Sequence, residues 1–141
     1  MAAFIAWYVI ITLLGWLAFP LVYRLFPALA DRGFTLARAA GLLLWAYVFW
    51  LCTTLGLSFN NLGGILFGLL PLIALSAWAA LQPRAETEKA DGNRLAEMRH
   101  WLRDNIGLVV TAEVLFLVAF ILLALLRAGN PTLDNDEKPM E

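Results

Sequence analysis

Acidic side chains occur at two places in this 141-residue chain where they could take part in catalysis, metal binding or a contact inside the membrane. Asp134, Asp136 and Glu137 lie close together near the end, with the first two in an Asp-x-Asp pattern. Neighbouring carboxylates can raise one another's pKa, which suits a general base, and their hard oxygen atoms suit Mg²⁺ or Mn²⁺. Glu113 lies instead in a long apolar segment, where an isolated ionised carboxylate is costly.

The position of Glu113 predicts a contact between helices. It lies about 10 to 12 Å into the hydrocarbon by helical rise, counted from Ile106. We expect the carboxyl group to face the bundle and to be protonated or hydrogen-bonded. Candidate partners are Thr53, Thr54, Tyr47 or a polar group on a helix outside this chain. A structural tether, meaning a side-chain contact that holds two helices together, is favoured. A proton or small-solute conduit through Glu113 is the alternative.

Four long apolar segments must position these acids. The chain is 62% hydrophobic and 15% charged, so it is more apolar and less charged than an average soluble domain. Each segment can cross a hydrocarbon core of roughly 30 Å, and backbone groups in hydrocarbon require the internal hydrogen bonds of a helix. We therefore predict an all-α integral membrane bundle over 1–126 and an acidic tail over 127–141. The predicted spans are 2–23, 39–58, 62–81 and 106–126.

Basic residues divide unequally between the two sides of this bundle. Two lie after the fourth segment, and eight lie in the first and third connections: Arg24, Arg32, Arg38, Arg84, Lys89, Arg94, Arg99 and Arg103. Because Lys and Arg accumulate in cytoplasmic loops, connections 24–38 and 82–105 are predicted to be cytoplasmic. Both termini are then extracytoplasmic, in a multi-pass protein of the plasma membrane.

Smaller patterns predict how the helices pack. Gly64 and Gly68 have the G-x-x-x-G spacing that lets two helices approach closely, or they simply leave room for bulky neighbours. Pro71 should kink the same helix or lie where another group takes up the freed carbonyl. Residues 94–104 show helical apolar spacing with arginines, which predicts a short amphipathic helix on the membrane surface. Aromatic residues near the ends of the spans, including Tyr23, Trp78 and Trp101, are typical of interfacial anchors.

Other sites of recognisable chemistry are missing from the sequence. It has no glycine-rich phosphate loop, no Ser/His/Asp set and no Cys/His metal cluster, and its one cysteine, Cys52, excludes an intrachain disulfide. His100 is expected to be solvated or interfacial rather than a ligand or a switch. We expect no catalysis, cofactor or nucleic-acid binding from these four helices by themselves.

Three segments together resemble a known family. DRGFTLARAAGLLLWAYVFWL (31–51), EVLFLVAFILLALLRAGNP (113–131) and EKPME (137–141) are similar to the N-terminal region of the YYY-domain integral membrane proteins, a domain of unknown function. Members of that family are much longer and continue into an outer loop and further spans. They in turn resemble the GT-C glycosyltransferases, which use a lipid-phosphate-linked sugar.

The resemblance implies a role for the acidic tail. Asp136 and Glu137 stand where the first outer loop of such enzymes carries its catalytic acids, and Asp134 with Asp136 would then hold Mg²⁺ or Mn²⁺ in a full-length relative. The chain would be the N-terminal transmembrane segment of a larger glycosyltransferase-like protein, in contact with lipid, with its remaining spans and with a lipid-linked sugar. A small structural or accessory subunit of a membrane complex, without catalysis, is the other reading.

Overall fold

The computed structural model describes residues 2–82 and 94–129, and all regular secondary structure in those ranges is helical. Four candidate membrane spans, at Ala3–Leu25, Ala37–Thr54, Leu62–Leu81 and Ile106–Gly129, confirm the predicted all-α membrane bundle. The third span consists of two helices. The elements are α1 (Ala2–Leu25), α2 (Ala37–Thr54), α3 (Leu62–Phe67), α4 (Leu69–Leu81), α5 (Arg94–Asp104) and α6 (Ile106–Gly129).

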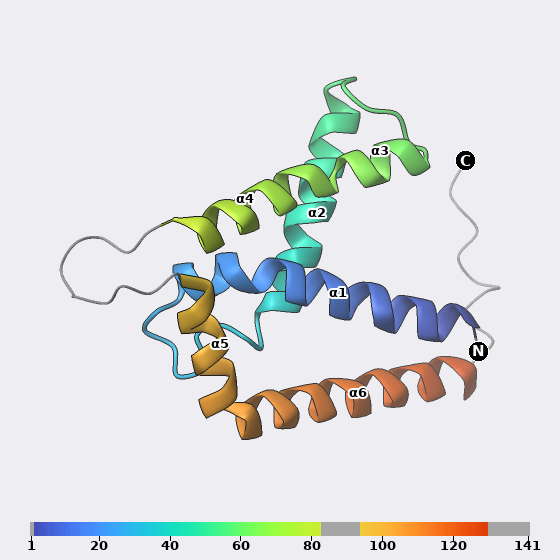
Figure 1. Ribbon diagram of the computed structural model, residues 1–141. Coiled ribbons are helices and arrows are strands. Elements are labelled where there is room, and N and C mark those ends of the chain that lie inside the picture. The colour runs from blue at the N-terminus through green and yellow to red at the C-terminus, as the bar shows by residue number, and fades with distance from the viewer. Residues whose placement is uncertain (1, 83–93, 130–141) are drawn as a thin grey trace.

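Helix α1 lies at the centre of this arrangement. Figure 1 shows α4 along one side of α1 and α6 along the other, with α2 crossing α1 at a steeper angle. The most extensive helix contacts are those of α1 with α2 and with α4. The start of α1 and the end of α6 lie at the same end of the bundle, and α5 lies at the opposite end with the α1–α2 connection (Figure 1).

The third span is interrupted at Gly68, between α3 and α4. Pro71 explains the position, because it has no N–H to donate to the carbonyl of Phe67 four residues earlier. One more carbonyl near the interruption is taken up from outside the helix, since the indole Nε1 of Trp45 on α2 donates to the oxygen of Ile65 at 2.8 Å. The expected kink thus appears as a break that α2 stabilises.

A tight turn organises the connection between α1 and α2. The Asp31 carboxylate accepts hydrogen bonds from the backbone N–H groups of Gly33 and Thr35, each at 3.0 Å, and from the Thr35 hydroxyl at 2.5 Å. Burial alone would raise the pKa of Asp31, but these donors hold its pKa below the ordinary value. Arg32 and Gly33 have φ angles of 49° and 77°, so the turn uses the left-handed region twice in succession.

Aromatic rings fill the core at this end of the bundle. Phe19 packs against Tyr23 and Phe34 with centroid separations of 5.6 and 5.4 Å, and Trp101 of α5 contacts both Phe19 and Tyr23. Tyr23 is only 4% exposed. The expectation that Tyr23 anchors the protein at the interface is therefore wrong. Trp101 is half-buried and attaches α5 to α1, and its role as an interfacial anchor stays a prediction. Trp78 remains exposed, as an anchor requires.

Candidate functional site: an ion pair between the second and sixth helices

Two glycines bring α1 and α2 close together beside the candidate site. A Cβ atom at Gly41 would lie 2.6 Å from the backbone oxygen of Leu14 and 3.1 Å from Cβ of Ala18. A Cβ atom at Gly15 would lie 2.6 Å from Cγ of Arg38. Only glycine leaves room at these two positions, so the first turns of α2 pass directly over α1.

This crossing places Arg38 opposite Glu113. Arg38 lies in the first turn of α2 and its Nη2 donates to Oε2 of Glu113 on α6. The two side chains are 10% and 26% exposed, respectively. The guanidinium also lies 4.1 Å from the ring centroid of Phe116, one turn further along α6. Arg38 therefore contacts a carboxylate and an aromatic face on the same helix.

The partner of Glu113 differs from those expected from the sequence. Thr53 and Thr54 donate their hydroxyls to carbonyl oxygens of their own helix, at 2.9 and 2.8 Å, and Tyr47 is exposed. Arg38 had been assigned to the cytoplasmic connection 24–38. That connection ends earlier, because α2 begins at Ala37, which is 2% exposed inside the bundle. Sequence reasoning missed Arg38 because a charge at the edge of an apolar segment resembles a loop residue.

A small cavity adjoins the ion pair. Its volume is about 10 Å³, and it is lined by Thr12, Gly15, Trp16, Phe34, Ala37, Arg38 and Glu113. Within the described residues, the hydroxyl of Thr12 and Nε of Arg38 are buried without a hydrogen-bond partner. A space of this size accommodates about one water molecule between such groups. The site can therefore hold a charge pair and a water molecule, but it has no room for a substrate.

Aromatic residues provide a contact of α6 with α1, in addition to Val109 of α6, which is buried in the core. Tyr8 lies against Phe116 and Phe120, with centroids 5.8 and 5.6 Å apart, and Phe4 lies 4.7 Å from Phe120. Only 6% of the residues in the most apolar stretch of α6 are buried, compared with 33% in that of α1. The ion pair and this aromatic seam thus hold a helix that otherwise has a largely exposed surface.

The glycines predicted to mediate packing have two different neighbours. A Cβ atom at Gly68 would lie 3.1 Å from Cβ of Phe49, so Gly68 faces α2. Gly64 lies against the carbonyl of Phe59 and the hydroxyl of Ser58 in the connection before α3. Gly15 and Gly41, which were not predicted as packing positions, leave room for the close crossing of α1 and α2. The small-xxx-small spacing of Ala37 and Gly41 was the available signal.

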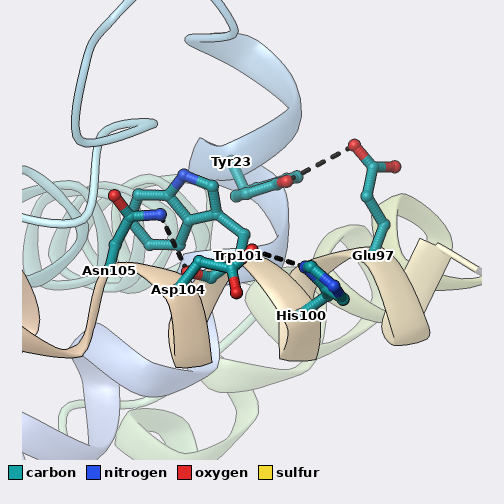
Figure 2. A network of polar contacts seen from close by, with 6 residues as sticks. All are labelled: Tyr23, Glu97, His100, Trp101, Asp104 and Asn105. Carbon is teal, nitrogen blue, oxygen red and sulfur yellow. Dashed lines mark hydrogen bonds and ion pairs between the residues drawn. The ribbon is translucent and has the colours of Figure 1, made fainter.

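Helix α5 carries a separate set of polar contacts, which Figure 2 shows from close by. The Tyr23 hydroxyl donates to Oε1 of Glu97 at 3.4 Å. His100 is exposed and lies 2.5 Å from a carboxylate oxygen of Asp104, one turn later. The side-chain amide of Asn105 donates to the carbonyl of Trp101 at 2.9 Å and closes the last turn of α5 (Figure 2). These contacts stabilise α5 and its junction with α6.

The predicted catalytic pair, Asp136 and Glu137, and the predicted metal ligands, Asp134 and Asp136, lie outside the described residues. Their roles stay predictions. Within residues 2–82 and 94–129, no group of three or more His, Cys, Asp or Glu residues is placed to hold a metal ion. Glu113 is the one predicted site residue with a described polar partner on another helix.

The four apolar spans and the ion pair between two of them define a helical integral membrane protein. The family model described as "Uncharacterized membrane protein (DUF2298)" matches residues 44–141, which is more than half of the chain, and the chain belongs to that family. Glu113 lies within the matched segment and Arg38 precedes it. No curated protein and no solved structure matches the chain.

Proposed function

We propose that this chain is a structural platform, meaning a helical bundle that fixes the position of α6 within a larger membrane protein. The observation that supports it best is the pairing of Arg38 with Glu113. A helix with so little buried surface has few other contacts to define its position, and a charge in hydrocarbon is tolerated when it is paired. The exposed surface of α6 would then pack against further spans of a longer protein, as the resemblance to the YYY-domain family implies.

The geometry favours the tether over the conduit. The Arg38 guanidinium donates a hydrogen bond directly to the carboxylate of Glu113. The adjoining cavity of about 10 Å³ has room for about one water molecule. A proton carrier needs a carboxyl group that can exchange protons with water along a path. A carboxylate bonded to a permanently charged arginine is poorly suited to that exchange.

A double-mutant cycle tests the tether. Removing one partner of a buried pair costs about 3 to 5 kcal/mol because an uncompensated charge remains. Arg38→Gln and Glu113→Gln should therefore each lower the melting temperature in detergent more than the double variant does. Cross-linking of Tyr8→Cys to Phe116→Cys by a bifunctional maleimide, in a Cys52→Ser background, would report whether α6 stays against α1.

The Glu113→Gln variant also distinguishes the proton conduit from the structural tether. Proteoliposomes with a pH-sensitive dye inside would show a proton flux that Glu113→Gln abolishes if the conduit is correct. An absence of flux together with strong coupling in the cycle supports the tether. Independent effects of the two substitutions, with no coupling, would contradict it.

The finer proposal is that the platform belongs to a glycosyltransferase-like enzyme that uses a lipid-phosphate-linked sugar. Its support is the resemblance to the YYY-domain and GT-C proteins, and the order of the chain, in which residues 130–141 directly follow α6. Glu137, with Asp136, would then act as the base that deprotonates an acceptor hydroxyl. Asp134 and Asp136 would be able to hold a divalent metal beside the phosphate.

Sugar transfer can be measured in membranes that express the natural gene product. A radiolabelled polyprenyl-phosphate sugar is the donor, and labelled product is the readout. Glu137→Gln should abolish transfer, whereas the matched control Glu141→Gln should retain it. Transfer that survives Glu137→Gln, at equal protein level, would exclude the proposed base without affecting the structural platform.

A further inference from the structure

A second cavity, lined by polar residues, lies at the end of α1 and shares no lining residue with the cavity beside the Arg38–Glu113 pair. Its volume is about 200 Å³, and it is lined by Tyr23, Arg24, Pro27, Arg32, Arg94 and Glu97. These residues come from the last turns of α1, from the α1–α2 connection and from the start of α5. Three segments of the fold therefore converge on one opening, which we call the arginine cavity.

The arginine cavity carries an excess of positive charge. Among the described residues that line it, Arg24, Arg32 and Arg94 are basic and Glu97 is acidic. Glu97 is engaged by the Tyr23 hydroxyl, as Figure 2 shows. One carboxylate cannot balance three arginines, so the cavity attracts anions.

Arg24 and Arg32 are each held by an aromatic ring. The Arg24 guanidinium lies 4.0 Å from the ring centroid of Trp78, and within the described chain its Nη1 is buried without a hydrogen-bond partner. The Arg32 guanidinium lies 5.1 Å from the ring centroid of Tyr23, and its backbone is held at a φ of 49° by the turn at Asp31. The two rings therefore help to fix two of the cavity's arginines in position.

We propose that the arginine cavity binds the phosphate group of an anionic phospholipid. Guanidinium groups match phosphate oxygens in geometry and charge, and several of them together form a common recognition arrangement for phosphate. The cavity lies where α1 ends at Leu25, on the side of the bundle with α5 and the predicted cytoplasmic connections. That is the expected depth of lipid headgroups, and the exposed ring of Trp78 next to Arg24 suits the same layer.

The experiment measures the binding of added lipid to the delipidated protein in detergent. Native mass spectrometry would compare phosphatidylglycerol, which carries a net charge, with zwitterionic phosphatidylcholine. The variants are Arg94→Gln and Arg32→Asn; asparagine tolerates the positive φ at position 32. The matched control is Arg99→Gln, which removes one charge from an exposed position on α5 outside the cavity.

Phosphatidylglycerol should bind in preference to phosphatidylcholine, and each cavity variant should weaken that binding roughly five- to tenfold. Arg99→Gln should leave it unchanged. Equal weakening by Arg99→Gln would show a diffuse charge effect and overturn the site, and so would unchanged binding in both cavity variants. Displacement of the lipid by inorganic phosphate at millimolar concentration would assign the cavity to a soluble anion and overturn the lipid assignment. Circular dichroism of each variant verifies that α-helical content is retained.

Discussion

Gly15 shows how one missing side chain can determine the position of a charge. It lies on α1, under the stem of Arg38, and it lines the small cavity beside the ion pair. The long arginine side chain can extend from the first turn of α2 to α6 because position 15 has no Cβ atom in its path. Gly15 is therefore a positioning residue for the contact between Arg38 and Glu113.

The substitution Gly15→Ala tests this role. The new methyl group would lie 2.6 Å from Cγ of Arg38, so the arginine must move away from Glu113. We expect a loss of about 1 to 3 kcal/mol in stability, measured by thermal unfolding in detergent. Gly107→Ala on α6 is the control, because its Cβ atom would meet nothing within 4 Å. Equal effects of the two substitutions would contradict the positioning role.

Asp31 gives a pH dependence with a defined sign. Its pKa is lowered below the ordinary value of 3.8 in the folded protein, so the unfolded chain takes up a proton first as the pH falls. The stabilisation is therefore complete above that value and is lost as the pH falls through the lowered pKa. Asp31→Asn should reduce the melting temperature at about pH 6 and have a smaller effect at about pH 3. A difference that does not shrink at low pH would contradict the prediction.

At the scale of the elements, the break in the third span depends on a bond from outside. Trp45→Phe removes the N–H that donates to the oxygen of Ile65, while an aromatic ring remains. We expect a loss of about 1 kcal/mol and faster hydrogen exchange in α3 and the start of α4. Trp50→Phe, at a 60% exposed position on α2, should have little effect. Unchanged exchange in the Trp45 variant would show that the break needs no such support.

The elements themselves were largely predictable, because length and apolar composition determine what can span a bilayer. The surface pattern of residues 94–104 likewise predicted α5, although its Trp101 is used for packing. The ends of α2 were less predictable. It was expected over 39–58 but occupies Ala37–Thr54, because the chain leaves the helix just before Gly56, whose φ is 72°. The partner of Glu113 was not predictable from spacing, since it depends on how deeply the first turn of α2 is buried.

At the scale of the whole molecule, the orientation of the bundle in the membrane can be tested by labelling residues on each of its two sides. Ala30, in the basic α1–α2 connection, and Asn60, between α2 and α3, are exposed at positions that the charge distribution assigns to opposite sides. In a Cys52→Ser background, an impermeant maleimide should label Asn60→Cys in intact cells. Ala30→Cys should react only after the membrane is opened. The reverse labelling pattern would invert the predicted topology.

The pairing of Arg38 with Glu113 also has an electrical consequence for the bundle. Moving one elementary charge across the membrane potential involves electrical work of about 2.3 kcal/mol per 100 mV. The two side chains carry opposite charges and lie together, so as a unit they add no net charge for the field to act on. A shift of α2 and α6 as one body would then require no electrical work from this pair. Loss of either partner would leave a single charge in the field and make the position of its helix sensitive to the potential.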